Sequence, residues 1–334
     1  MSILRTTKLR WTSITPEDAH SGGGSKLPWP TRALYAVCQK ERAILLSKNA
    51  PIWPARSIIR FPPQRALGGP MDLTRFAEIC EKAVRRAGRV LLDKLGRVSV
   101  REKGQADLVT DADFASQEAV REVVFSALPG HVVIGEEDSW VSGASGLDSE
   151  YCWVVDPLDG TTNYVHQVPH FCVSLALLHA GKPVVGAVFH PTADECFTAV
   201  RGQGAYLNRK PAHCSVVGRL SEALAAIGFP AVVRPDSPDL KVFIEAVQAC
   251  QSIRRTGSAA LNLAYVAAGR FDACWSFSTK AWDAAAGVLL VEEAGGVVTS
   301  PDGGPFVPEQ GYFLAAANLQ LHRALREVIE RAGR

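Results

Sequence analysis

The segment Trp153–Tyr164, with the sequence W-V-V-D-P-L-D-G-T-T-N-Y, places two carboxylates and a glycine directly after a short apolar run. The apolar run predicts a buried strand, and Pro157 predicts that the strand ends there, because proline cannot donate to a sheet ladder. Asp156 and Asp159 then share one turn, and Gly160 allows close approach of the backbone. Such a turn either caps a helix that begins near Gly160 or binds a cation.

The composition is that of an ordinary globular protein. The chain has 334 residues, 47% of them hydrophobic and 21% charged, which suits one large or two medium domains. No apolar run reaches the length of a membrane helix. The eight cysteines are scattered without a C-x-x-C pair. This pattern favours reduced, buried thiols in a cytoplasmic protein over a disulfide framework or a zinc site.

The first 70 residues differ from the rest of the chain. They contain eleven of the 36 Lys and Arg residues but three of the 34 Asp and Glu residues, together with eight of the 20 prolines. Only residues 33–46 have the pattern of a short helix. The segment could be a targeting sequence, a tail for nucleic acid or a membrane surface, or an extension outside the working protein. We favour the extension, because a well-formed domain opening begins at Met71.

From Met71 onwards, helical and strand patterns alternate, which indicates layered α/β packing. The predicted helices cover 72–91, 114–128, 240–250, 259–268, 284–294 and 319–332. The predicted strands cover 98–101, 132–134, 153–155, 171–178, 184–189, 196–200, 205–207, 223–229, 271–277, 297–299 and 312–316. The close spacing of the runs between 171 and 207 predicts antiparallel neighbours. We divide this part into an N-terminal subdomain, 71–213, and a C-terminal subdomain, 214–334.

Acidic residues recur where strands end or helices begin. They are Glu136, Asp156, Asp159 and Asp283, with Asp113 in a polar turn before a helix. An acid at a helix start also suits the helix dipole, which accounts for one such residue more easily than for several. Carboxylates without histidine or cysteine partners select hard cations, chiefly Mg²⁺.

Converging carboxylates of this kind suit phosphate chemistry. Two or more cations a few ångströms apart can bridge a phosphate, activate water and steady the leaving oxygen. Thr161 could orient that water, while Gly160 and the amides that follow could bind phosphate oxygens. The sequence therefore predicts a hydrolase.

Three motifs occur in the order found in the inositol monophosphatase family, which the chain resembles from about Met71 to its end. They are G-E-E at 135–137, D-P-L-D-G-T-T-N at 156–163 and W-D-A-A-A-G at 282–287, and D-L-V-T-D-A-D at 107–113 and G-S-A-A at 257–260 also fit. The resemblance implies a lithium-sensitive phosphomonoesterase with two or three Mg²⁺ ions. It also implies a layered α-β-α-β-α sandwich, a small phosphorylated substrate, a homodimer, and no nucleic-acid or membrane partner.

The resemblance also assigns roles to individual residues. Glu136, Asp156 and the Leu158 carbonyl would hold the first metal, and Asp156, Asp159 and Asp283 the second. Glu136 and Thr161, the latter backed by Asp113, would position the attacking water. The turn of Leu158, Asp159, Gly160 and Thr161 would carry the phosphate, and Gly257, Ser258 and Ala259 would line the sugar side with Ser276 and Asp283.

One position departs from the family pattern. Inositol-specific members have a Glu seven residues before the second-motif Asp, where this chain has Ser276. A serine cannot replace a carboxylate that binds two hydroxyls. Inositol 1-phosphate remains the first expected substrate, and histidinol phosphate and 3′-phosphoadenosine 5′-phosphate are the alternatives. A non-catalytic regulatory member is a further alternative, although no acidic ligand is missing.

Several other residues receive ordinary structural roles. We expect His166 and His170 to be loop residues or to lie behind the site, and Trp282 to pack beside Asp283. We expect Lys280 to be solvated at the surface.

Overall fold

The computed structural model of the chain describes residues 72–138 and 149–333. The expectations for residues 1–70, including the short helix at 33–46 and the start at Met71, lie outside these ranges. Among the described residues, no helix combines the length and hydropathy that a membrane crossing requires. The seven cysteines in these ranges are all free, as predicted.

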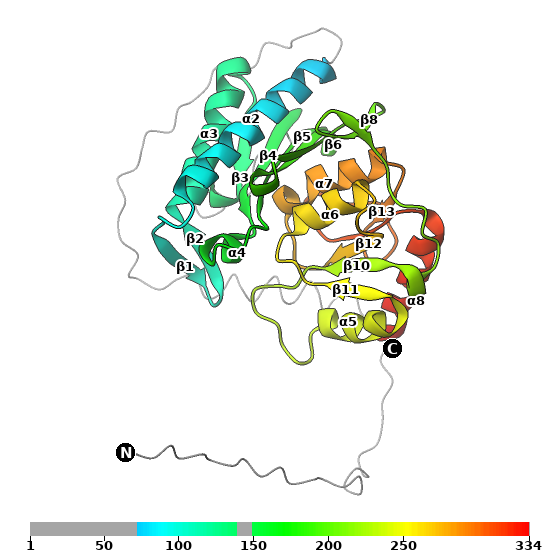
Figure 1. The fold of residues 1–334 in the computed structure, drawn as a ribbon. Coiled ribbons are helices and arrows are strands. Elements are labelled where there is room, and N and C mark those ends of the chain that lie inside the picture. The colour runs from blue at the N-terminus through cyan, green and yellow to red at the C-terminus, as the bar shows by residue number, and fades with distance from the viewer. Residues whose placement is uncertain (1–71, 139–148, 334) are drawn as a thin grey trace, which may run out of the picture. The chain divides into compact units, whose positions relative to one another are not determined.

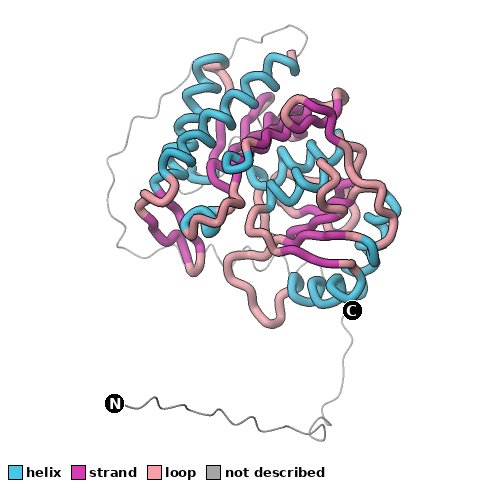
Figure 2. The backbone as a smooth tube through the Cα atoms, viewed as in Figure 1, coloured by secondary structure: helices cyan, strands magenta, loops and turns pink. Residues whose placement is uncertain are grey.

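The described chain forms five layers, α-β-α-β-α, as predicted (Figures 1 and 2). The first helical layer contains α2 (Leu73–Lys94) and α3 (Asp111–Ala127), the middle layer α6 (Ala259–Ala267) and α7 (Ala281–Glu293), and the last layer α5 (Pro238–Ala249) and α8 (Leu319–Ala332). A separate hairpin, β1 (Val100–Gly104) with β2 (Asp107–Thr110), precedes α3.

The sheet between the first and middle helical layers has seven strands in the order β3-β4-β5-β6-β7-β8-β9. Their bounds are β3 Val132–Gly135, β4 Tyr151–Asp159, β5 Cys172–His179, β6 Lys182–His190, β7 Glu195–Val200, β8 Gly204–Leu207 and β9 Lys210–Ala212. β3 and β4 are parallel, and the remaining neighbours are antiparallel, as expected from their close spacing in sequence.

The second sheet has five strands in the order β11-β10-β12-β14-β13. Their bounds are β10 Leu224–Ile227, β11 Ser252–Arg254, β12 Ala273–Ser276, β13 Val297–Thr299 and β14 Phe313–Ala316. All of these strands follow Cys214, whereas the strands of the seven-stranded sheet precede it. Helices α6 and α7 contact both sheets, so they join the two halves of the chain.

Three apolar cores fill the spaces between the layers, because side chains alternate across each strand. In β4, Trp153 and Val155 face α2 and α3, whereas Cys152 and Val154 face the core of α6 and α7. In β12, Cys274 faces this middle core and Trp275 faces the core with α5 and α8. Both faces of each sheet are therefore covered, which explains why the strands are apolar runs rather than alternating sequences.

Three local expectations were wrong. Strand β4 does not end at Pro157 but continues to Asp159, with a register irregularity between Asp156 and Asp159. A bulge of this kind tolerates proline because the ladder is already interrupted there. The helix predicted over 114–128 begins earlier, at Asp111, and Phe114 lies on its exposed side, with 49% of the residue exposed. Residues 107–110, expected as part of a polar turn, form strand β2 and pair with β1.

Candidate active site

Three carboxylates from distant parts of the sequence converge at the end of β4. Glu136 begins a short 3₁₀ turn, η2 (Glu136–Asp138), directly after β3, and Asp156 lies in β4. Because β3 and β4 are parallel and Gly135 pairs with Val155, these two acids are neighbours. One oxygen each of Glu136, Asp156 and Asp283 lies within 4.8 Å of the others.

Asp283 reaches this cluster through a contact between β5 and α7. Ser174 of β5 pairs with Asp156 in the antiparallel ladder. The Ser174 hydroxyl donates to the carbonyl of Trp282, 3.0 Å away. This bond fixes the first turn of α7 beside β4. The expectation that Trp282 packs next to the acid agrees with its contact with the middle core.

Each of the three carboxylates already uses one oxygen within the protein. Asp156 Oδ1 accepts from the Leu158 amide at 2.9 Å, and Asp283 Oδ2 accepts from the Lys280 amide at 2.9 Å. Glu136 Oε1 lies 3.0 Å from Lys103 Nζ.

The cluster is electrostatically unfavourable without a cation. Burial, followed by the charge of neighbouring acids, raises the pKa of Asp156 well above its ordinary value. The same two causes raise the pKa of Asp283 to about 8. Buried like charges disfavour ionisation, and a divalent cation would reverse the effect.

Asp159 is placed differently from the other acids. It ends β4, beyond the bulge, and its Oδ2 accepts from Ser258 Oγ and from the Ala260 amide, both at 2.7 Å. Burial raises the pKa of Asp159 to about 6, although these hydrogen bonds favour the ionised form. Asp159 is therefore near the site but outside the group of three that converge most closely.

Thr161 and Asp113 lie next to each other at the end of β4. Thr161 Oγ1 lies 3.0 Å from the Leu158 carbonyl and 3.4 Å from Asp113 Oδ1. Asp113 is 1% exposed, and its Oδ2 accepts from the amide and the hydroxyl of Thr110. Burial raises the pKa of Asp113 to about 6. The Leu158 carbonyl, predicted to bind metal, is occupied by the Thr161 hydroxyl here.

Asn163 links the 158–161 turn to the 257–259 segment, which is predicted to line the sugar side of the substrate. Its Nδ2 donates to the carbonyls of His170 at 2.7 Å and Thr256 at 2.9 Å. Gly257 has φ +89°, and a side chain there would meet Asn163. The 257–259 segment is thereby held beside the 158–161 turn. Asn163 belongs to the motif at 156–163, but its link to the 257–259 segment depends on contacts between distant parts of the sequence, which a local pattern does not reveal.

Ser276 lies at the end of β12 and is 1% exposed. Its hydroxyl is 3.5 Å from that of Ser278, and a methyl group at Gly228 would lie 2.6 Å from it. Its contact with substrate stays a prediction.

Sequence reasoning missed Lys103. This residue of β1 has a side chain that is 6% exposed, and its Nζ lies 2.6 Å from Glu137 Oε1 as well as beside Glu136. Burial opposes the charged form, but the two glutamates outweigh it and raise the pKa of Lys103. The polar sequence K-G-Q-A at 103–106 does not indicate that its lysine is buried.

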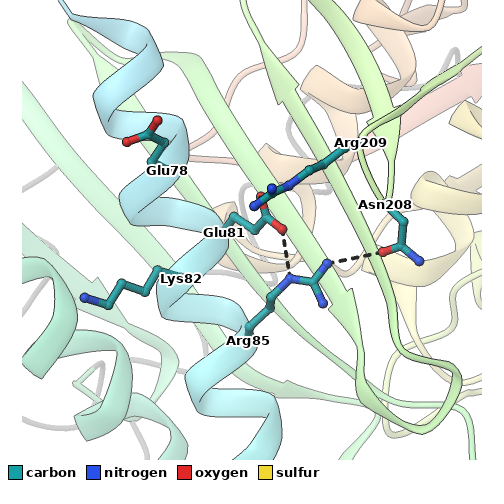
Figure 3. A pocket seen from close by; sticks show the side chains of 6 residues that line it. All are labelled: Glu78, Glu81, Lys82, Arg85, Asn208 and Arg209. Carbon is teal, nitrogen blue, oxygen red and sulfur yellow. Dashed lines mark hydrogen bonds and ion pairs between the residues drawn. The ribbon is translucent and has the colours of Figure 1, made fainter.

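A surface hollow of about 310 Å³ lies away from these acids, between α2 and the β8–β9 turn (Figure 3). Its lining residues are Glu78, Glu81, Lys82, Arg85, Asn208 and Arg209. Arg85 crosses it, with Nε 2.9 Å from Glu81 Oε1 and Nη2 3.3 Å from Asn208 Oδ1. Its central charges are thus paired with each other, and we assign the hollow no part in the chemistry.

The five-layered sandwich, the buried carboxylates and the threonine at one strand end fit the phosphomonoesterase class that the sequence predicts. A profile of the inositol monophosphatase family matches residues 72–334, and the chain belongs to this family. The inositol-1-monophosphatase of Rhizobium meliloti is 42% identical over 265 residues, which cover 78% of this chain and 98% of that protein. The Nus factor SuhB of Pseudomonas aeruginosa is 41% identical over 260 residues, which cover 75% of this chain and 94% of that protein.

Solved structures of family members are similar to this structure. The inositol monophosphatase of Anabaena is 39% identical, has a TM-score of 0.70 and covers 78% of this chain and 97% of its own. The SuhB protein of Bartonella henselae is 36% identical, has a TM-score of 0.72 and covers 77% and 99%. The protein is therefore a phosphomonoesterase of this family that acts on small phosphorylated substrates.

Proposed function

We propose that the protein hydrolyses the phosphate monoester of a small polyol or sugar in a Mg²⁺-dependent reaction, with inositol 1-phosphate as the first candidate substrate. The observation that carries this proposal is the convergence of Glu136, Asp156 and Asp283 within 4.8 Å. The similarity to inositol-1-monophosphatases supports the substrate class.

The donor set fits Mg²⁺. It consists of carboxylate oxygens without nitrogen or sulfur, and hard divalent cations prefer such ligands. Glu136, Asp156 and Asp283 would hold one or both ions, and Asp159 would contribute a further carboxylate oxygen. When bound, Mg²⁺ supplies positive charge for the phosphate oxygens and lowers the pKa of nearby water.

The chain's own residues then position the reactants. Thr161 Oγ1, held by Asp113 and the Leu158 carbonyl, and the Glu136 carboxylate orient a water in line with the ester bond. The water oxygen attacks phosphorus and the ester P–O bond breaks. The proton that the water loses passes through solvent to the leaving alkoxide, so the products are the alcohol and inorganic phosphate. Backbone amides of the 158–161 turn hold the phosphate, and 257–259 line the organic group.

A panel of substrates tests the proposal. With Mg²⁺, inositol 1-phosphate should turn over faster than histidinol phosphate or 3′-phosphoadenosine 5′-phosphate. Fructose 1,6-bisphosphate belongs in the panel because an Aquifex aeolicus relative, 38% identical, is named fructose-1,6-bisphosphatase/inositol-1-monophosphatase. Asp156→Asn should lower kcat by at least about 10²-fold. Negligible turnover of inositol 1-phosphate would exclude the first substrate, and an active Asp156→Asn variant would exclude the metal assignment.

A regulatory function is the second candidate, because several relatives are named Nus factor SuhB. Retention of all four predicted acidic ligands favours catalysis. A regulatory role that survives Asp156→Asn would show that the two activities are separate. We also propose a homodimer, which light scattering of the purified protein would test.

A further inference from the structure

The N-terminus of α6 holds one side of the Asp159 carboxylate. Oδ2 accepts from Ser258 Oγ and from the Ala260 amide, both at 2.7 Å. Several donors on one side of a buried carboxylate fix its rotation and favour its ionised form. Asp159 Oδ2 is therefore held against the start of α6.

The hydroxyl of Ser258 is fully committed to this arrangement. Ser258 is 2% exposed, and its single hydroxyl hydrogen is donated to Asp159. Its oxygen accepts from the Leu261 amide at 3.2 Å, so Ser258 also caps α6. The Cys172 thiol, 3.6 Å away, packs against the remaining side. A hydroxyl donates only one hydrogen, so Ser258 has none left for a substrate.

A neighbouring hydroxyl anchors the same helix without touching Asp159. Thr256 Oγ1 donates to Asn262 Oδ1 at 2.7 Å, in the first turn of α6. Thr256 and Ser258 therefore both stabilise the start of α6, and only Ser258 reaches the carboxylate. This difference separates a structural role from a role in metal binding.

We propose that Ser258 is a positioning residue that turns Asp159 Oδ2 toward α6 and thereby sets the affinity of the second Mg²⁺ ion. The inference rests on the proposed Mg²⁺ dependence and reassigns the Ser258 side chain from the substrate wall. The backbone of 257–259 keeps its predicted contact with the organic group of the substrate.

The test compares Ser258→Ala and Ser258→Gly with Ser258→Thr, and uses Thr256→Val as the matched control. Removing a group that orients a metal ligand lowers metal affinity by about 10- to 100-fold. The Mg²⁺ concentration for half-maximal activity should therefore rise by at least about 10-fold in the Ala and Gly variants, with kcat reduced and KM at saturating Mg²⁺ changed little. Ser258→Thr should restore wild-type behaviour. Thr256→Val should lower the melting temperature without raising the Mg²⁺ requirement.

A second readout needs no turnover. Mn²⁺ titration followed by electron paramagnetic resonance should show weaker binding of one ion in Ser258→Ala and unchanged binding in Thr256→Val. Ser258→Gly keeps the helix start if Ala misfolds, since glycine is tolerated at an N-cap. Unchanged Mn²⁺ binding in both variants, or a rise in KM alone, would overturn the inference. If the wild type bound no Mn²⁺ or Mg²⁺, the proposed function would fail as well.

Discussion

Gly160 occupies a backbone conformation that other residues adopt only under strain. Its φ is +101°, and a methyl group there would lie 3.1 Å from the His170 carbonyl oxygen. We predict that Gly160→Ala lowers the free energy of unfolding by about 1–2 kcal/mol. It should also lower kcat, because the turn carries Asp159 and Thr161. Urea denaturation and steady-state kinetics measure the two effects.

Gly202 is the matched control. It also has positive φ, +77°, but a methyl group there meets nothing within 4 Å. Gly202→Ala should therefore show the backbone strain without a loss of kcat. Equal activities for the two variants would contradict the assigned role of the turn.

His170 should make stability depend on pH. Burial, followed by the nearby His190, lowers the pKa of His170 from 6.5 to about 4. Between these values the unfolded chain binds the proton and the folded chain does not, so stability is lost as pH falls from 6.5 toward 4. The urea midpoint of the wild type should fall in this range more steeply than that of His170→Phe. His166→Phe, at an exposed position, should follow the wild type; parallel curves for all three proteins would exclude the effect.

The sequence identified the site residues that lie at the end of a strand or at the start of a helix. Glu136, Asp156 and Asp283 follow this rule and do converge. Lys103 was missed because its side chain is buried only where the β1–β2 hairpin brings it to Glu136 and Glu137. The Ser258 hydroxyl was predicted on the substrate side, and its bond to Asp159 depends on the contact between β4 and α6.

At the scale of elements, the close packing of β6 on α7 should govern where Asp283 lies. A methyl group at Gly186 would lie 3.0 Å from the Ala286 Cα and 3.1 Å from its carbonyl oxygen. Backbone cannot yield as a flexible side chain does, so Gly186→Ala should lower the free energy of unfolding by about 1–3 kcal/mol.

The same change should lower kcat by about 10-fold or more, because small displacements of a ligand-bearing helix are costly. Melting curves and kinetics at saturating Mg²⁺ would measure it. Gly130→Ala is the control, since nothing lies within 4 Å of its added methyl group. Unchanged kcat in Gly186→Ala would mean that α7 tolerates this displacement.

The long amphipathic elements were the most predictable. Helix α2 begins after Asp72, whose Oδ1 accepts from the Arg75 amide, and α8 has the predicted bounds Leu319–Ala332. Short elements were not predictable in the same way. β9 and β11 have three residues each, and β11 is an edge strand of its sheet, so their sequences carry too few alternating positions to give a pattern.

At the scale of the whole molecule, the family profile matches residues 72–334. We therefore predict that a chain beginning at Met71 has the kcat, KM and Mg²⁺ requirement of the full-length protein. Parallel assays of the two chains test this. A marked loss of activity in the shorter chain would assign the first 70 residues a part in catalysis.

Repulsion among the buried carboxylates should lower the stability of the metal-free protein. Because the folded pKa of Asp283 is about 8, its ionised form opposes folding when no cation is present. Asp283→Asn should raise the melting temperature in EDTA, since an amide oxygen can still accept from the Lys280 amide. In the wild type, a Mg²⁺ concentration of 100 times Kd should add about 2.7 kcal/mol per site.

The Asp283→Asn variant should lose most of that Mg²⁺ stabilisation, so the order of the two melting temperatures should reverse between EDTA and saturating Mg²⁺. Asp111→Asn is the control. Asp111 is exposed, and its hydrogen bond with Lys94 Nζ at 2.7 Å lowers its pKa, so its ionised form favours the fold. That variant should be slightly less stable in both conditions and keep the full response to Mg²⁺. If Asp283→Asn melted below the wild type in EDTA, repulsion among the converging acids would not limit the metal-free protein.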